Sequence, residues 1–272
     1  MGPSHQKEAL PNQDSFAYFH SDHLIAIAVA DGLGSARHSS EGSCYATQLA
    51  VHLLISYLHH HESSWRDISD TRMLKQQIVA KWQREFRHSM AEYDTTLLFL
   101  GLTPAVCVMG QLGDGLILYK NSNQPVSNHI FKVPQKEFLN KPDASLAQPD
   151  AGEYFCVEEY PVNPNNDYSA FLLITDGIAD DLTDPIVYFD DLLKRASCLW
   201  PGHWNTELNK HLTEWPTPGH YDDKTLVLLR LGDEESKKSQ EHGEASGLEK
   251  SKGNESSTGE APSVTSIDKE SP

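Results

Sequence analysis

The sequence predicts an α+β fold in which antiparallel sheet is covered by helices on the outside. The strand-like segments come in runs instead of alternating one by one with helices, two long helical segments fall together, and several links between strands have only two or three residues. Such short links permit antiparallel pairing only, because parallel neighbours need a crossover of about a dozen residues. A doubly wound parallel sheet is therefore not expected.

Apolar runs and helical periodicity give the expected order of elements. The predicted strands are residues 16–20, 24–30, 95–102, 105–112, 116–119, 153–160, 170–175 and 225–231. The predicted helices are residues 39–61, 70–90, 185–196 and 205–214. The apolar faces of the first two helices are expected to consist of Tyr45, Leu49, Leu53 and Leu54, and of Met73, Ile78, Trp82 and Phe86. The three strands between residues 95 and 119 are expected to pair with their sequence neighbours, since their links are so short.

The charge balance argues against two classes of partner. The chain has 272 residues with 22 Lys and Arg against 39 Asp and Glu, a formal net charge of −17. Nucleic acids and anionic membranes both require a basic face, so neither is expected as a partner. Residues 233–272 hold ten acidic side chains, five lysines and no aromatic residue, too little apolar surface to offset ordering entropy. We expect one domain at residues 1–232 and a disordered acidic tail at residues 233–272.

Cysteine usage and the absence of long apolar stretches bear on location. No stretch approaches the roughly 20 apolar residues that span a bilayer. The N-terminus has no apolar segment typical of a secretory signal. Cys44, Cys107, Cys156 and Cys198 lie far apart without a C-x-x-C motif, and three of them fall in apolar segments, so buried free thiols are expected. These features predict a cytoplasmic protein.

Aspartates gather at the ends of the predicted strands. In chain order they are Asp14 in NQDSF, Asp31 in VADGLGS, Asp114 in LGDGL, Asp176 in ITDGI, and Asp222 and Asp223 in YDDKT. A single Asp-Gly pair is a common turn. Carboxylates at apolar strand ends, however, cost desolvation free energy unless a shared cation compensates it, and oxygen ligands suit Mg²⁺ or Mn²⁺. The set predicts a site for divalent cations.

The same motifs carry a resemblance to a known family. NQDSF, VADGLGS, Thr95-Thr96, GDG, ITDGIADDL and DDKTLVLL recur in the order and approximate spacing of the metal-dependent Ser/Thr protein phosphatases of type 2C, the PPM family. The chain resembles the compact bacterial branch of this family over residues 4–231. The resemblance implies a four-layer α-β-β-α sandwich of two antiparallel sheets flanked by helices. It also implies a signalling hydrolase that removes phosphate from phosphoserine and phosphothreonine in protein substrates, with a Ser/Thr kinase as its counterpart.

The resemblance further implies two Mg²⁺ or Mn²⁺ ions at one end of the sandwich. Asp31 would bridge both ions, and the Gly32 carbonyl would bind one of them. Asp176 and Asp222 would hold the other ion, and Asp14 would act through an ion-bound water. On this basis Asp14, Asp31 and Asp176 are the expected catalytic residues.

Two more aspartates belong to the implied site. Asp114 together with Asp176 matches a third, weaker metal position of bacterial members. Asp223 stands in the place of a common Asn, although a shift of one residue would exchange it with Asp222. The implied nucleophile is a water activated between two ions, so no protein nucleophile is expected.

Some positions depart from the family pattern. The Arg that often grips the phosphate is replaced by Ala9, so His5 or Arg37 is expected in that role. Leu33 stands where many members have a His thought to protonate the leaving group, which leaves solvent or His38 as the proton source. Asp94 replaces the usual Gly before Thr-Thr, a change that could alter substrate contacts.

Some sequence features allow other interpretations than an active phosphatase. A catalytically weak or inactive phosphatase-fold module that senses or scaffolds is the alternative, and loss of ligands would favour it, but every core aspartate is present. A phosphatase for anti-sigma-antagonist partners shares the DD-x-T ending but usually carries sensor domains. GLGSAR lacks the third glycine of a dinucleotide loop, and Asp31 would repel a pyrophosphate.

Three smaller features have two interpretations each. The histidines His52, His59, His60 and His61 are expected on a solvated helix end and not at a zinc site, because consecutive helical residues point in different directions. Trp200, Trp204 and Trp215 are expected to pack locally, with a peptide-docking wall as the alternative. The acidic tail aids solubility or occupies the metal site as a weak autoinhibitor. A monomer is expected.

Overall fold

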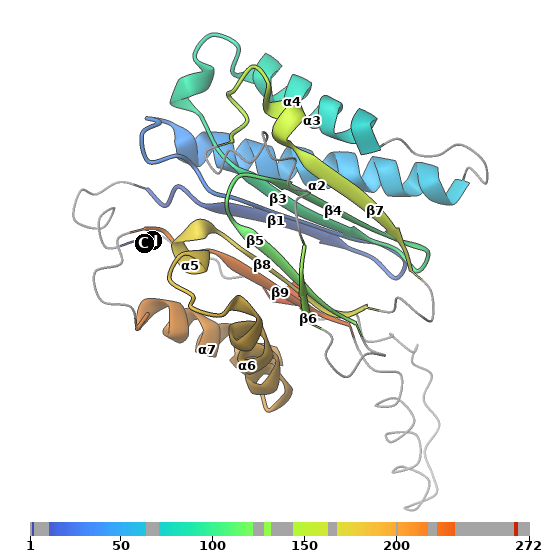
Figure 1. Ribbon diagram of the computed structural model, residues 1–272, viewed down its shortest axis with the longest axis vertical. Helices are drawn as coiled ribbons and strands as arrows, with labels where there is room; N and C mark the ends of the chain where they lie inside the picture. The colour runs from blue at the N-terminus through green and yellow to red at the C-terminus, as the bar shows by residue number, and fades with distance from the viewer. Residues whose placement is uncertain are drawn as a thin grey trace, which may run out of the picture.

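The computed structural model describes residues 2, 11–63, 71–121, 128–131, 144–162, 168–199, 201–216, 222–231 and 264–265. Figure 1 shows four layers in the order helices, sheet, sheet, helices. Every strand pair in both sheets is antiparallel. The predicted α-β-β-α sandwich is therefore confirmed.

The first sheet has the strand order β1-β2-β3-β4-β7. Its strands are β1 (Ser15–His20), β2 (Ile25–Ala30), β3 (Leu97–Leu102), β4 (Val106–Leu112) and β7 (Cys156–Pro161). Strands β2, β3 and β4 are buried along their whole length, since helices cover one face and the second sheet covers the other. Such two-sided burial explains why their sequences are continuous apolar runs.

The second sheet has the order β10-β9-β8-β5-β6. Its strands are β5 (Leu116–Asn121), β6 (Asn128–Ile130), β8 (Tyr168–Ile174), β9 (Leu226–Arg230) and β10 (Val264–Thr265). β10 was not expected, because it lies in the acidic tail. Its backbone pairs with Leu228 and Leu229 of β9, which are otherwise at the edge of the sheet, so this short part of the tail adds a strand to the domain.

The structure corrects one expected strand pairing. β4 and β5 are joined by only a short turn, yet they lie in different sheets. Gly113, with a φ of 100°, begins the turn that carries the chain from the first sheet to the second. Added side-chain atoms at Gly113 would collide with Thr96, so the turn needs a glycine here. The crossing places Asp114 between the two sheets and not at the tip of a hairpin.

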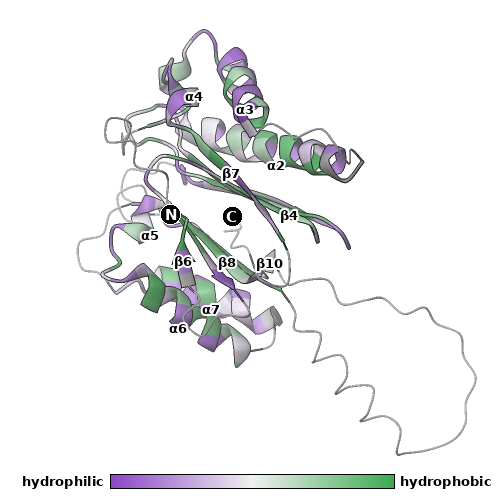
Figure 2. Ribbon diagram, turned by 45° about the vertical axis from the view of Figure 1, so that its right-hand side comes forward, coloured by the Kyte–Doolittle hydropathy of each residue, from purple (hydrophilic) through white to green (hydrophobic). Residues whose placement is uncertain are grey.

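Helices cover the outer faces of both sheets. α2 (Ser39–Ser63) and α3 (Thr71–Glu85) lie on the first sheet, and α6 (Pro185–Ser197) and α7 (Pro201–Thr213) lie on the second (Figure 1). The shorter elements are the 3-10 helix η1 (Met90–Glu92), α4 (Ala151–Tyr154) and α5 (Asp176–Ala179). Figure 2 shows that these helices mix hydrophobic and hydrophilic residues, as expected for helices with one buried face.

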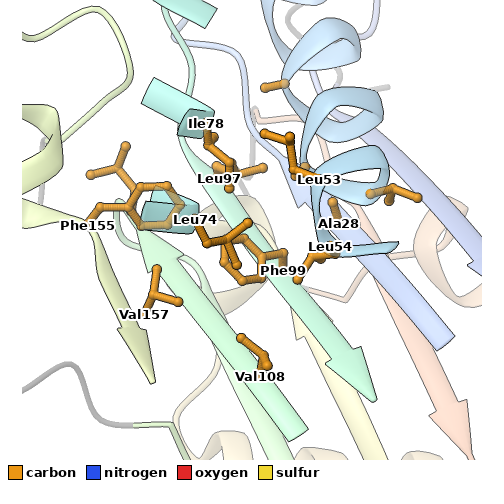
Figure 3. Close-up of a cluster of buried hydrophobic side chains, with 14 of the residues drawn as sticks. Ala28, Leu53, Leu54, Leu74, Ile78, Leu97, Phe99, Val108, Phe155 and Val157 are labelled. Atoms are coloured by element: carbon orange, nitrogen blue, oxygen red, sulfur yellow. The ribbon is translucent and has the colours of Figure 1, made fainter. Parts of the chain in front are cut away.

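Three apolar clusters fill the spaces between the layers. One lies between the first sheet and α2/α3, where Figure 3 shows Leu53, Leu54, Ile78 and Phe99 packed together. The second lies between the sheets, and the third lies between the second sheet and α6/α7. Met73 was expected to point inward but is 54% exposed, because the buried stripe of α3 consists of Leu74, Ile78, Val79 and Trp82.

Two further expectations concern thiols and membranes. All four cysteines are free, but only Cys107 is buried, Cys156 is half-buried, and Cys44 and Cys198 are exposed. The expected burial of Cys198 was therefore wrong. In the described part of the chain, no helix has both the length and the apolar character needed to cross a membrane.

Candidate metal centre

Asp31 is held at the end of β2 by the two threonines that precede β3. The Thr96 amide donates to the Asp31 carbonyl at 2.8 Å, and the Thr95 hydroxyl donates to the same oxygen at 2.6 Å. The Asp31 amide in turn donates to the Thr96 hydroxyl at 3.1 Å. The Thr95-Thr96 pair therefore fixes the backbone from which the Asp31 carboxylate projects.

Gly32 lies where the chain has no room for a side chain. A Cβ there would be 2.7 Å from the Gln13 carbonyl oxygen and 2.7 Å from the Ser39 Cβ. The Gly32 amide donates to the Gln13 carbonyl at 3.2 Å, which links this turn to the segment before β1. Gly32 thus brings Asp31 close to Asp14, the residue that follows Gln13.

Asp14 is buried and only partly satisfied by hydrogen bonds. Its Oδ2 accepts from the Thr175 hydroxyl at 2.9 Å, whereas its Oδ1 is buried and lacks a hydrogen-bond partner within the described residues. Burial, followed by the charge of Asp223, raises the pKa of the Asp14 carboxyl. An unpaired buried carboxylate oxygen is costly unless a ligand completes it.

Asp176 begins α5, directly after β8. Its Oδ1 accepts from the Gly177 amide at 2.6 Å. Burial, and then the charges of Asp114 and Asp222, raise the pKa of Asp176 to about 7. Asp114, on the turn between the sheets, is therefore within electrostatic range of Asp176.

Asp222 and Asp223 are adjacent in sequence but differ in environment. Asp223 is 1% exposed, and its carboxylate accepts from the Gln13 amide at 2.7 Å and from the Gly2 amide. Asp222 is exposed, and its charge contributes to the raised pKa of both Asp31 and Asp176. Asp222 thus belongs with the other carboxylates, whereas the carboxylate of Asp223 is bonded to the Gly2 and Gln13 amides.

The carboxylates from the two sheets repel one another. Burial is the largest cause of the raised pKa of Asp31, and the charges of Asp14, Asp176 and Asp222 add to it. Like charges at one place favour protonation or a bound cation. The donors are all oxygens, and Asp14 Oδ1 is an unpaired acceptor, so the residues present fit a hard divalent cation.

The carboxylates alone do not complete a coordination shell. Across the residues that the structure describes, no three carboxyl, imidazole or thiol groups are arranged to hold an ion by themselves. Mg²⁺ in proteins commonly keeps several waters and takes only one or two carboxylates, so this arrangement is compatible with a largely hydrated ion.

The other residues predicted for the site have mixed outcomes. Arg37 is exposed in the loop that leads from Asp31 to α2. His5 lies outside the described residues, as does Trp200. Trp204 and Trp215 are buried in the cluster under α6 and α7, so their expected local packing is confirmed.

Sequence reasoning missed the role of Asp94. Its Oδ1 accepts from the amides of Thr95 and Ala147, both at 2.9 Å, and its Oδ2 accepts from the Ser145 hydroxyl at 2.7 Å. The carboxylate is therefore engaged inside the protein, where it ties residues 145–147 to the threonine pair that holds Asp31. An Asp directly before Thr-Thr was visible in the sequence, but its partners lie about fifty residues further along the chain.

The structure is a four-layer α-β-β-α sandwich in which carboxylates from both sheets gather at one end. A model of the family described as Protein phosphatase 2C matches residues 1–215. The chain belongs to the protein phosphatase 2C family. The matched part contains Asp14, Asp31, Asp114 and Asp176 but ends before Asp222.

Solved structures with the same fold include proteins from animals and bacteria. A C. elegans sex-determining protein aligns with a TM-score of 0.56 and 15% identity, over 80% of this chain and 61% of that chain. A bacterial serine phosphatase gives 0.53 and 15% over 82% and 93%. A serine/threonine phosphatase from S. agalactiae gives 0.51 and 15% over 82% and 94%. At these identities the likeness shows the fold alone. A search of curated proteins finds no match.

Proposed function

We propose that this protein is a metal-dependent phosphoprotein phosphatase that hydrolyses phosphoserine and phosphothreonine. The observation that carries the proposal is the convergence of acidic side chains from both sheets, which together raise the pKa of Asp31. Membership of the phosphatase family supports the reaction class. The formal charge of −17 supports a cation requirement, because a phosphate dianion is repelled from an acidic end that no cation neutralises.

Each residue has a proposed part in holding two ions of Mg²⁺ or Mn²⁺. Two of the groups that would hold the ions, the Asp31 carboxylate and the Gly32 carbonyl, extend from the first sheet. The other two, Asp176 and Asp222, extend from the second sheet. Asp14, with Oδ2 fixed by the Thr175 hydroxyl, would use its unpaired Oδ1 to orient a water. When bound, such ions supply Lewis acidity toward phosphoryl oxygens and lower the pKa of a coordinated water.

Asp114 and Asp223 have different proposed parts. Asp114, with Asp176, would form a third, weaker position, as its effect on the pKa of Asp176 supports. Asp223 was included among the predicted ligands, but its carboxylate already accepts hydrogen bonds from the Gly2 and Gln13 amides. We therefore propose Asp222 as the ligand of the pair and Asp223 as its structural support.

Arg37 and His5 are the proposed phosphate-gripping residues, and His38 or solvent is the proposed proton source for the leaving group. The His38 ring stacks on Tyr93, with ring centroids 5.1 Å apart, and its Nδ1 lies 3.4 Å from Glu41 Oε1. A His38→Gln variant should slow hydrolysis of a phosphoserine peptide but not of p-nitrophenyl phosphate, whose leaving group needs no proton. If His38→Gln slowed both substrates equally, His38 would not be the proton source, and solvent would be the donor.

The proposal extends to the cellular setting. It includes phosphorylated protein substrates, which family membership supports, together with a Ser/Thr kinase that acts in opposition, a cytoplasmic location and a monomeric state. Removal of residues 233–272, including β10, tests whether the acidic tail inhibits the enzyme. Unchanged phosphatase activity in the shortened chain would reject autoinhibition.

Hydrolysis of a phosphopeptide tests the proposed reaction directly. The full chain should release phosphate with Mn²⁺ and lose this activity with a chelator or in the Asp176→Ala variant. Activity that persists in chelator would contradict the metal dependence. No activity in the unaltered chain with either ion would instead favour the inactive sensor or scaffold.

A further inference from the structure

A buried lysine lies just behind the acidic end. Lys224 is two residues after Asp222, in the link that leads into β9, and its side chain is only 6% exposed. Its Nζ lies 3.5 Å from Asp181 Oδ2 and 5.5 Å from the centroid of the Trp215 ring. A buried ammonium group is costly unless it is paired, and Asp181 supplies the paired charge.

Asp181 connects three separate segments of the chain. It follows α5, the element that begins with Asp176, and Figure 1 shows α5 at one end of the second sheet. The same Oδ2 that faces Lys224 accepts from the Trp215 indole N–H at 2.7 Å. Trp215, which follows α7, is itself 8% exposed and packs edge-on to Tyr188 and His211. The ion pair is therefore anchored to the helical layer.

The turns that carry Asp176 and Asp222 are also joined on their other side. The Thr175 amide donates to the Thr225 carbonyl at 3.1 Å, and the Thr225 amide donates to the Thr175 hydroxyl at 3.1 Å. Between these two points of attachment the turns approach closely, since a Cβ on Gly177 would be 2.0 Å from the Asp223 carbonyl oxygen. Two like-charged carboxylates are thus held near each other by contacts on both flanks.

We propose that the Lys224–Asp181 ion pair, seated on Trp215, is a brace that keeps Asp176 and Asp222 at the spacing a divalent cation needs. Lys224, Asp181 and Trp215 are then positioning residues and touch neither ion nor substrate. This inference rests on the proposed function, because it assumes that these two carboxylates bind cations.

The brace makes a prediction opposite in sign to that of simple electrostatics. As a charge alone, Lys224 repels a cation at Asp222, so its removal would tighten metal binding. As a brace, Lys224 holds the two carboxylates in place, so its removal would weaken metal binding. Substitutions of groups that hydrogen-bond to metal ligands commonly cost about 10–100-fold in affinity, and a brace that acts through the backbone should fall at the low end of this range.

The test is a titration of the metal-free full chain with Mn²⁺, with free Mn²⁺ measured by electron paramagnetic resonance. The Lys224→Met variant should bind Mn²⁺ about tenfold more weakly than the unaltered chain. Lys224→Arg, which keeps the ion pair, should restore affinity. Trp215→Phe, which removes the indole N–H donor and leaves a smaller aromatic ring beside Lys224, should weaken affinity less than Lys224→Met.

Two matched controls separate the brace from other effects. Lys194→Met removes an exposed lysine from the same helical layer and should leave Mn²⁺ affinity unchanged. Leu208→Ala opens a cavity in the apolar cluster under α6 and α7 and should lower the melting temperature without changing affinity.

The outcomes distinguish this inference from the proposed function. Unchanged or tighter Mn²⁺ binding by Lys224→Met, or equal weakening by Leu208→Ala, would overturn the brace while the unaltered chain still bound the ion. Absence of Mn²⁺ binding by the unaltered chain would overturn the proposed function, and the brace with it.

Discussion

In the half of the acidic end built on the first sheet, Asp31 is fixed by short hydrogen bonds to its own backbone from Thr95 and Thr96. In the half built on the second sheet, Asp176 and Asp222 lie on turns beyond the ends of β8 and β9. One backbone hydrogen bond, from the Thr175 amide to the Thr225 carbonyl, and the side chains of Thr175, Lys224 and Asp181 hold those turns. The first half therefore continues the backbone pairing of β2 with β3, whereas the second depends more on side-chain contacts that single substitutions can remove.

The largest expected effects come from neutralising one carboxylate in each half. Asp31→Asn and Asp176→Asn should each lower phosphatase activity by about 1000-fold, because each removes a charged oxygen ligand. Both should stabilise the metal-free protein, by about 1–2 kcal/mol for Asp31→Asn and less for Asp176→Asn, since burial and repulsion by three carboxylates raise the pKa of Asp31 further than that of Asp176. Activity assays and urea denaturation in chelator measure the two effects. Destabilisation by Asp31→Asn would contradict the repulsion.

The adjacent aspartates before β9 sharpen the comparison. Asp222→Asn should weaken Mn²⁺ binding by about a hundredfold and leave stability nearly unchanged, since Asp222 is exposed. Asp223→Asn should instead lower the free energy of unfolding by about 1.5–3 kcal/mol, because the Gln13 and Gly2 amides lose a charged acceptor. Calorimetric metal titration and denaturation of both variants test this division. If Asp223→Asn weakened Mn²⁺ binding and Asp222→Asn lowered stability, Asp223 would be the ligand and Asp222 the structural support.

The metal-free protein should lose stability as pH rises. The pKa is raised to about 6 for Asp14 and about 7 for Asp176, so the folded state keeps protons that the unfolded state releases near pH 4. The free energy of unfolding should therefore fall between about pH 4 and pH 7. Stabilisation by Mn²⁺ should grow over the same range, because the ion competes with these protons. Melting temperatures with chelator and with Mn²⁺ measure both trends, and a flat profile in chelator would contradict the raised pKa values.

A smaller effect is expected from the contact that supports the first half. Asp94→Asn keeps an acceptor for some of its partners but loses the charge, so it should lower stability by about 1 kcal/mol. Hydrogen exchange should quicken at the Ala147 amide, which donates to Asp94. Exchange at Ala170, inside β8, serves as the control. Unchanged protection of the Ala147 amide in Asp94→Asn would show that Asp94 does not anchor residues 145–147.

The sequence allowed much of the fold to be predicted, because its buried strands are continuous apolar runs. Residues 24–30 and 170–175 were both identified in this way, and β2 and β8 occupy these positions. The crossing at Gly113 could not be predicted, because a short link between two strands is also typical of a hairpin. Only the packing of a second sheet on the first separates the two cases.

The aspartates could be identified from the sequence, but their different environments could not. Spacing alone left Asp222 and Asp223 interchangeable, and the structure separates them because the N-terminal segment reaches Asp223. Lys224 passed unnoticed for a related reason, since its partner Asp181 lies 43 residues earlier in the chain. Such contacts depend on tertiary structure and leave no local pattern.

Crystals of the full chain grown with Mn²⁺ and measured at the manganese absorption edge test the central claim most directly. An anomalous peak within coordinating distance of Asp31, and another beside Asp176 and Asp222, is the predicted result. A well-ordered acidic end with no anomalous peak, or with manganese bound only elsewhere on the surface, would contradict it.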